Sequence, residues 1–431
     1  MILPKTEHNR VLTMYKPFSV DYLNLLLSFS DAVDLASTRL SQHQIRTAFI
    51  CWEMGKAAGL DSKDTDDLFT AALIHDIGAL SPEDKIDLHR VEVYDTEKHC
   101  ILGKKLLGPV PGFERIAGIV RHHHTPYPKL VPLSRKDALL AQILNLADNI
   151  ERAIDRTRFI LHQSDDISNL VGGLSEAILP EAIDLFLKVS VREDFWLDVV
   201  SQRIYGYLLN SGPCRHRVLD LQQVRDFSRL FRNMIDYRSH FTATHSAGVS
   251  ASAVALAGFM GKSEIGCSLM EIAGDLHDLG KLAIPNSILM KPDRLTPEEY
   301  AIVKQHTYFT YSVLISIEGM QQIAEWAAFH HERLDGDGYP FHLTGKEINL
   351  GSRIMAVADI LTALAEERPY RAGLPQDKVM GVIRKQVGSG ALDGGVVDAL
   401  EADYREIIAR MLKSQHEAHE YFVKEIQPLT V

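Results

Sequence analysis

Apolar residues along this chain recur at intervals of three and four, the spacing that places side chains on one face of a helix. The clearest runs lie in residues 68–75 and 270–277, where small and apolar side chains at i, i+3 and i+4 precede a histidine at i+7. Alternation of apolar and polar residues with a period of two, which would indicate strands, is scarce. The pattern therefore predicts an all-α fold.

Helix boundaries are marked as well. Residues 296–299 read Thr-Pro-Glu-Glu, which is typical of a helix start because the threonine caps, the proline suits the first turn and a glutamate completes a capping box. Helix-breaking residues gather at 126–132, 211–213 and 335–340. We expect these segments to be loops, and the middle one is the candidate domain boundary.

The chain also repeats itself at an offset of about 200 residues. The offset is 202 for the first matched histidine and for a His-Asp pair, and it grows to 207, 208 and 211 further along, as small loop insertions would cause. The matched positions are His43 with His245, His75-Asp76 with His277-Asp278, His99 with His306, His122-His123 with His330-His331, and Asp148 with Asp359.

A repeat of this length predicts two tandem helical bundles of common ancestry. We place them at residues 1–210 and 211–431, and a chain of 431 residues is long enough to give each bundle its own core.

Composition adds one strong feature, an excess of histidine. The chain has 19 histidines, and ten of them lie at the matched positions. Histidine binds metals and exchanges protons near neutral pH. The four cysteines are widely spaced, without a CxxC motif, and indicate reduced thiols in a cytoplasmic protein rather than disulfides.

The net charge and the length of the apolar stretches argue against some classes of function. A net charge of −11 argues against binding to long nucleic acid, which depends on many Lys and Arg contacts to phosphate. The N-terminus has no signal peptide and no stretch is apolar for long enough to cross a bilayer. We expect a soluble cytoplasmic protein without a membrane segment, and a homodimer is compatible with the sequence.

In the second half the matched residues have the chemistry of a metal centre. Imidazole and carboxylate together suit Fe, Mn, Ni or Zn, and the absence of thiolate argues against a structural zinc site. Adjacent His277 and Asp278 can bind such that the carboxylate bridges two ions, an arrangement that supports attack on phosphorus. The candidate metal ligands are His245, His277, Asp278, His306, His330, His331 and Asp359.

Longer motifs surround these ligands. The His-Asp pair continues as HDLGK at 277–281, the paired histidines continue as HHERLDGDGYP at 330–340, and RPYR follows at 368–371. From about residue 225 to 375 the chain resembles the HD-GYP subfamily of HD-domain phosphohydrolases. The resemblance implies hydrolysis of a cyclic dinucleotide second messenger of bacteria, cyclic di-GMP or 3′,3′-cyclic GMP-AMP, at a binuclear Fe or Mn centre, with other divalent metals open.

Beside this resemblance, physical roles can be assigned. His277, Asp278 and Lys281 are the expected catalytic residues, with the lysine neutralising charge that develops on the phosphate. The expected substrate-binding residues are Lys281, Gly338, Tyr339, Arg368 and Arg371. The two arginines lie at i, i+3 and resemble the family's phosphate-holding positions.

One position departs from family members that hold three metals. Those members have a glutamate four residues before the first ligand histidine, where this chain has Phe241. The difference predicts a binuclear centre and, by resemblance, a single cut that yields a linear 5′-phosphorylated dinucleotide.

The first half has a full ligand series but not the surrounding motifs. Ala79 replaces the lysine, His124 replaces the glutamate after the paired histidines, and no GYP or RPYR motif follows. This half resembles a general HD domain and is predicted to hold a second metal centre. Its candidate ligands are His43, His75, Asp76, His99, His122, His123 and Asp148.

Two functions stay open for the first half. It is either a 5′-nucleotidase that acts on the linear product of the second half, or a non-catalytic regulatory or dimerisation module. For the whole protein a partner-binding signalling module is the alternative to an enzyme. A nuclease with the same metals is disfavoured by the acidic charge and the lack of basic stretches.

Overall fold

The computed structural model describes residues 18–35, 41–88, 96–130, 133–238, 243–366 and 373–430. Within these ranges the fold is all-α, as predicted. The sheet found there has two short antiparallel strands, β1 (Val20–Asp21) and β2 (Val218–Leu219). No helix of the described ranges is long and apolar enough to cross a membrane.

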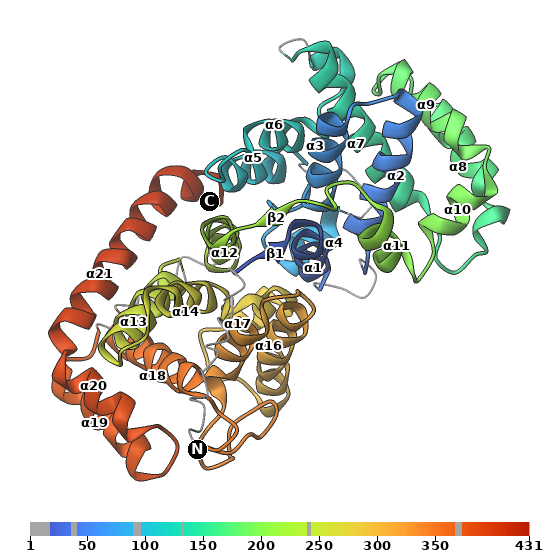
Figure 1. Cartoon of the computed structure of the whole chain (residues 1–431). Helices are drawn as coiled ribbons and strands as arrows, with labels where there is room; N and C mark the ends of the chain where they lie inside the picture. Colours follow the sequence, from blue (N-terminus) through green and yellow to red (C-terminus); the bar gives the residue numbers. More distant parts are fainter. Residues whose placement is uncertain are drawn as a thin grey trace, which may run out of the picture.

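The first half forms the upper part of the molecule in Figure 1, coloured blue to green. Its helices are α1 (Tyr22–Asp34), α2 (His43–Ala58), α3 (Ser62–Leu73), α4 (Pro82–Leu88), α5 (Thr96–Leu107), α6 (Glu114–His122), η1 (Tyr127–Lys129), α7 (Arg135–Ala153), η2 (Ile160–His162), α8 (Ser164–Gly172), α9 (Pro180–Ser190), α10 (Glu193–Val199) and α11 (Ile204–Ser211).

The second half forms the lower part, coloured yellow to red (Figure 1). Its helices are α12 (Leu221–Asp236), α13 (His245–Phe259), α14 (Glu264–Leu276), η3 (Leu279–Ala283), α15 (Asn286–Leu289), α16 (Pro297–Ile315), α17 (Gln321–Ala328), η4 (Phe329–His331), α18 (Leu350–Ala365), α19 (Gln376–Gly388), α20 (Gly394–Ala402), α21 (Tyr404–Tyr421), η5 (Phe422–Ile426) and α22 (Gln427–Thr430).

Local sequence explains where the key helices begin. The carboxylate of Asp21 caps α1, and Asp220 with Gln223 forms a capping box at the start of α12. Thr296, Pro297 and Glu299 start α16 as the sequence predicts. These caps satisfy amide groups that a helix leaves unpaired in its first turn.

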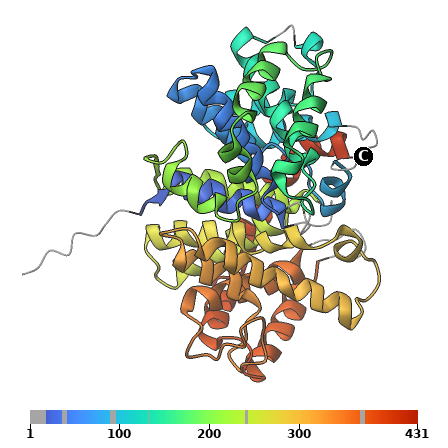
Figure 2. The same ribbon diagram turned by 90° about the vertical axis from the view of Figure 1, so that its right-hand side faces the viewer.

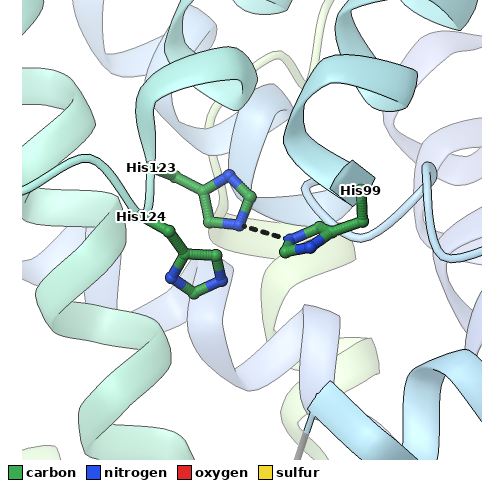
Figure 3. A group of neighbouring side chains, drawn as sticks. All are labelled: His99, His123 and His124. Carbon is green, nitrogen blue, oxygen red and sulfur yellow. Dashed lines mark hydrogen bonds between the residues drawn. The ribbon is translucent and has the colours of Figure 1, made fainter. Parts of the chain in front are cut away.

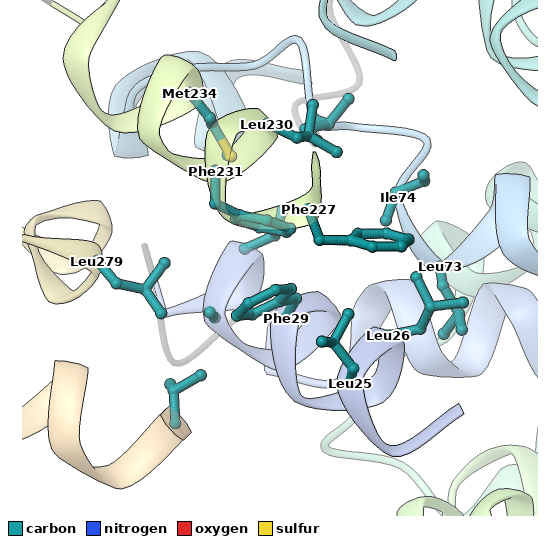
Figure 4. Packing of buried hydrophobic residues seen from close by; sticks show 14 of the residues in the cluster. Leu25, Leu26, Phe29, Leu73, Ile74, Phe227, Leu230, Phe231, Met234 and Leu279 are labelled. Atoms are coloured by element: carbon teal, nitrogen blue, oxygen red, sulfur yellow. The ribbon is translucent and has the colours of Figure 1, made fainter. Parts of the chain in front are cut away.

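The two halves meet through α1 and α12, which lie between them in both views (Figures 1 and 2). Phe29 and Phe231 are fully buried at this contact, with ring centroids 4.0 Å apart. They are 202 residues apart, the offset of the repeat, so equivalent positions of the two halves contact each other. Figure 4 shows these rings among Leu25, Leu26 and Met234.

This contact gives the chain one continuous apolar core rather than two separate cores. The C-terminal elements add a second link, because α21 runs along the second half (Figure 1) and η5 and α22, which continue it, contact α5 of the first. The hydroxyl of Tyr421 donates to the carbonyl oxygen of Lys105 at 2.9 Å, and the Lys105 ammonium pairs with Glu425. The boundary after residue 210 stays a prediction.

Candidate metal centres

The His-Asp pair of each half lies where a helix ends. In the second half α14 ends at Leu276, His277 is its C-cap residue and the chain continues through Asp278 into η3. A Cβ atom at Gly280 would stand 2.0 Å from the carbonyl oxygen of His306. Only glycine therefore lets this turn pack against the helix that carries the next ligand.

The first half is built in the same way. A Cβ atom at Gly78 would stand 2.0 Å from the carbonyl oxygen of His99. Glycine is thus required after each His-Asp pair because another helix packs closely on the turn, α5 in the first half and α16 in the second.

Five of the candidate ligand histidines are oriented by a backbone carbonyl three residues earlier. When Nδ1–H donates to that carbonyl, Nε2 keeps its lone pair for a metal. The Nδ1 to oxygen distances are 2.9 Å for His75 to Ala72, 2.6 Å for His123 to Val120, 2.8 Å for His277 to Gly274, 2.6 Å for His306 to Val303 and 2.7 Å for His330 to Ala327.

In the second half these side chains form two adjacent triads. The donor atoms of each triad lie within 4.8 Å of one another. Asp278 lies between the triads, with Oδ2 3.2 Å from Nε2 of His277 and Oδ1 3.4 Å from Nε2 of His306. This geometry fits one carboxylate bridging two ions. The triads are His245, His277 and Asp359, and His306, His330 and His331.

The first half has the same arrangement. Asp76 places Oδ2 3.5 Å from Nε2 of His75 and Oδ1 3.6 Å from Nε2 of His99. Its triads are His43, His75 and Asp148, and His99, His123 and His124.

One predicted ligand of the first half is wrong. His122 is the last residue of α6, and its ring is half-buried beside the Thr125 hydroxyl, with Nδ1 3.3 Å from that oxygen. The chain turns after it, so His123 and His124 are the pair that faces His99 (Figure 3). His124 is therefore the counterpart of His331, at an offset of 207, and not a replacement for the following glutamate.

Sequence reasoning also missed the carboxylate behind the first histidine of each half. Nδ1 of His43 lies 2.5 Å from Oε2 of Glu151, and Nδ1 of His245 lies 3.4 Å from Oε2 of Glu366. Both carboxylates are buried. Such partners fix the ring and raise its basicity toward a metal.

Electrostatics divide each set of histidines into two classes. Burial disfavours the charged form of His245, but hydrogen bonds to Asp359 and Glu366 outweigh it and raise its pKa to about 10. Burial lowers the pKa of His306 to about 3, and Asp278 compensates only partly. In the first half His43 and His99 behave in the same way, with the pKa raised for the first and lowered to about 3 for the second.

The carboxylates compensate these charges. Burial alone would raise the pKa of Asp278, but His277 and then Lys281 hold it well below its usual range. The Asp359 pKa is also lowered, because a hydrogen bond from His245 outweighs burial. Both groups are therefore ionised at neutral pH, which suits metal binding.

The donor sets fit divalent metals. Nε2 of His43 lies 3.3 Å from that of His75, and Nε2 of His99 lies 3.2 Å from that of His123. Two imidazole nitrogens bound to one ion at about 2.1 Å each lie roughly 3 to 3.5 Å apart. In addition, Nε2 of His277 is buried, and its 3.2 Å approach to Oδ2 of Asp278 lacks hydrogen-bond geometry. A metal ion would satisfy it.

The halves differ in what contacts the bridging carboxylate. In the second half Lys281 pairs with Oδ2 of Asp278 through its ammonium group. The equivalent residue of the first half is Ala79, and there the side-chain amide of Gln44 donates to Oδ2 of Asp76 at 3.2 Å. A positive group therefore lies beside the bridge in one half and a neutral group in the other.

The GYP loop is held by the glutamate after the paired histidines. Glu332 is buried and accepts hydrogen bonds from the amides of Phe341, at 2.7 Å, and Leu343, at 2.9 Å. Tyr339 lies against His331, with ring centroids 5.0 Å apart. The glutamate thus fixes the loop that brings the tyrosine to the second triad.

Gly338 has a structural role that the sequence pattern did not predict. A Cβ atom there would stand 2.4 Å from the amide nitrogen of Arg333 and 2.5 Å from Cα of Glu332. The glycine is needed for packing of backbone on backbone, and its contact with substrate stays a prediction. Arg333 pairs with Asp335 at the surface. The predicted Arg368, Arg371 and Phe241 lie outside the described residues.

Comparisons with known proteins agree with this division into halves. The HD-domain family is matched twice, at residues 40–153 and 229–396. The 3′3′-cGAMP-specific phosphodiesterase 1 of Vibrio cholerae is 28% identical over 89% of this chain and 92% of its own length. The cyclic di-GMP phosphodiesterase response regulator RpfG of Xanthomonas campestris is 40% identical over 40% of this chain and 46% of its own length.

The fold of almost the whole chain is similar to that of a solved structure. The cyclic GMP-AMP-specific phosphodiesterase of V. cholerae superposes with a TM-score of 0.62 and 22% identity, over 90% of this chain and 98% of that one. Both matched segments contain the ligand clusters described above. The chain therefore belongs to the HD-domain family, and it contains two HD domains.

Proposed function

We propose that the second HD domain is a metal-dependent phosphodiesterase that opens a cyclic dinucleotide to the linear 5′-phosphorylated dinucleotide. The observation that carries the proposal is the Asp278 bridge between two triads, with the ammonium of Lys281 beside it. Relatives named as 3′3′-cGAMP and cyclic di-GMP phosphodiesterases support the substrate class. Since the first of these covers both halves, 3′,3′-cyclic GMP-AMP is the first substrate to test.

Two divalent ions, which we propose to be Fe or Mn, would supply Lewis acidity at the scissile phosphodiester. Lys281 lines a cavity of about 320 Å³ together with His245 and Asp278. Its ammonium can neutralise the charge that grows on the phosphate oxygens, at a position that Asp278 fixes. Tyr339 offers an aromatic face beside the second triad, and Arg368 and Arg371 remain proposed phosphate contacts.

The proposed outcome is a single cut. Glu366 does not take the place of the glutamate that is absent at Phe241, because it faces Nδ1 of His245 while Asp359 lies 3.2 Å from Nε2. A third metal would therefore lack its carboxylate among the described residues. By resemblance to family members, two ions imply opening of the ring without release of mononucleotides.

The test loads the whole protein anaerobically with Mn or Fe and follows both cyclic dinucleotides by chromatography. A His277→Ala/Asp278→Ala variant should lose ring opening, while the matched His75→Ala/Asp76→Ala variant should keep it. If neither cyclic dinucleotide is opened by the loaded wild-type protein, the proposed function is wrong. If the second variant abolishes ring opening, the assignment to the second domain is wrong.

For the first domain we propose a phosphomonoesterase that removes the terminal phosphate of the linear product. A cation beside the ligand Asp148 favours this proposal, because the second domain has no cation at the equivalent position. Nη1 of Arg152 lies 3.5 Å from Oδ2 of Asp148, one helical turn after this ligand, where the second domain has Ala363. A guanidinium at this place can hold the terminal phosphate of the linear product by charge-assisted hydrogen bonds.

The His75→Ala/Asp76→Ala variant should then accumulate the linear 5′-phosphorylated dinucleotide, and Arg152→Gln should slow its removal while metal content is kept. If phosphate release continues unchanged in the double variant, the first domain is not the phosphomonoesterase. Its regulatory or dimerisation role would then be the remaining hypothesis. The homodimer stays a prediction for sedimentation analysis.

A further inference from the structure

A carboxylate of the first domain reaches into the second domain beside its cavity. Glu83 lies in the first turn of α4, and its two carboxylate oxygens are 3.0 and 3.3 Å from the backbone amide of Asn286. Asn286 is the first residue of α15 and lines the 320 Å³ cavity. The first domain therefore holds one end of a segment that forms the cavity wall of the second.

Asn286 is held from its other side by Arg238, which follows α12. The Arg238 guanidinium is buried and donates to Oδ1 of Asn286 at 2.7 Å, to the carbonyl oxygen of Ile284 at 2.6 Å and to that of Lys281. Burial lowers the Arg238 pKa to about 10, against the opposing effect of Glu83. The side chain is thus charged at neutral pH, and its bonds are charge-assisted.

These bonds fix the backbone of residues 281–286 at both ends. Lys281 begins this segment, and its ammonium pairs with the bridging carboxylate of Asp278. Since the Lys281 carbonyl and the Asn286 amide are both held, the path of the turn between them depends on Arg238 and Glu83 together. The contact series therefore runs from Glu83 through Asn286 and Arg238 to Lys281.

We infer that Glu83 is a positioning residue for the second domain, through which the first domain fixes the cavity segment that carries Lys281. This inference rests on the proposed phosphodiesterase function. If Glu83 has this role, the activity of the second domain depends on the first domain even when each domain has its full set of metal ligands.

The role proposed for Glu83 differs from a role in holding the two domains together. The side chain lies at an exposed position, and the halves are held together by the buried contact of α1 and α12. Loss of Glu83 should therefore leave the fold and the metal content intact. What should change is the order of residues 281–291 and the efficiency with which substrate is turned over.

The experiment uses the whole Mn-loaded protein and the variants Glu83→Ala and Glu83→Gln. Glutamine keeps an oxygen that accepts from the Asn286 amide, whereas alanine does not. For Glu83→Ala we expect kcat/KM for the cyclic dinucleotide to fall about fivefold to tenfold, mainly through kcat because Lys281 is misplaced, and Glu83→Gln should recover most of it. Glu181→Ala is the matched control, since Glu181 is an exposed carboxylate of the same domain paired with Arg135.

Hydrogen exchange measured by mass spectrometry gives a second readout that needs no catalysis. The peptide spanning 281–291 should exchange faster in Glu83→Ala than in wild type or Glu181→Ala. Unchanged exchange together with an unchanged kcat/KM would overturn the inference, as would a Glu83→Gln variant as impaired as alanine. A wild-type protein without phosphodiesterase activity would instead overturn the proposed function, while the exchange measurement would still decide the role of Glu83.

Discussion

Substitution of Gly280 by alanine should remove the metal centre of the second domain while the first domain keeps its own. The new Cβ atom would stand 2.0 Å from the carbonyl oxygen of His306 and 2.9 Å from Cβ of Phe309, where ordinary contacts begin near 3.4 Å. The turn and α16 must therefore separate by about 1.4 Å or deform. Such overpacking costs about 1–3 kcal/mol, and misplacement of a catalytic group by about 1 Å costs roughly 100-fold in rate.

The assay measures metal per chain after anaerobic loading, ring opening of the cyclic dinucleotide and the melting temperature. We expect Gly280→Ala to lose the second-domain metals, to open the ring at least 100-fold more slowly and to melt about 3–9 °C lower. Gly78→Ala should instead affect the first domain, since its Cβ would meet the His99 carbonyl oxygen at 2.0 Å.

The control is Gly381→Ala, in the interior of α19, where a Cβ atom would have nothing within 4 Å. It should be neutral or stabilise by about 0.5–1 kcal/mol, because alanine is the better helix former. If Gly280→Ala keeps the metal content and activity of Gly381→Ala, the close approach of Gly280 to His306 does not hold the metal centre in place.

Three further results are expected. Lys281→Met should lower kcat for ring opening about 10- to 100-fold with the metal content unchanged, and an unaltered kcat would exclude charge stabilisation by this lysine. Glu332→Gln leaves one of the two backbone amides that Glu332 accepts from without an acceptor, so it should cost about 1 kcal/mol of stability. Unchanged thermal unfolding would contradict the role of Glu332 in holding the loop. Metal binding at pH 7 should release protons, because the pKa of His245 is raised to about 10 and that of His43 well above its usual value, so both rings are charged in the metal-free protein. The release from His245 should shrink as the pH rises through about 10. Isothermal titration in buffers of different ionisation enthalpy measures the release, and the absence of any release at pH 7 would contradict the assignment.

Much of this architecture could be predicted from the sequence. Periodicity indicates helices without strands, and the 202-residue offset pairs His43 with His245 and Asp76 with Asp278. The structure brings these residues to equivalent places in two helical bundles. The prediction succeeds because a metal ligand must keep its type and its order along the chain, which a repeat search detects directly.

The error at His122 has a local cause. Three consecutive histidines, 122–124, allow two alignments with His330 and His331, and drift of the offset made both acceptable. The choice depends on where α6 ends, because the turn after His122 directs the next two side chains inward. Helix ends are the least predictable part of a helix, so sequence could not decide between the alignments.

Glu151 and Glu366 were missed for a different reason. They do not occupy matched positions of the repeat, since one follows Asp148 by three residues and the other follows Asp359 by seven. Both spacings keep the carboxylate on the helix face of the ligand aspartate. A search of the ligand helices for acidic residues at i+3, i+4 and i+7 would have found them.

The asymmetry between the domains follows from where the charges lie. A buried aspartate such as Asp76 or Asp278 is costly unless its partners are complete, so losing one ligand would leave an uncompensated charge inside the bundle. Lys281 and Arg152 are partly exposed at the edge of each centre, where a changed side chain leaves no buried charge behind. Two domains with the same type of ligand set can therefore differ at the edge, and they do so in the position of the cation, which is Lys281 beside Asp278 in the second domain and Arg152 beside Asp148 in the first.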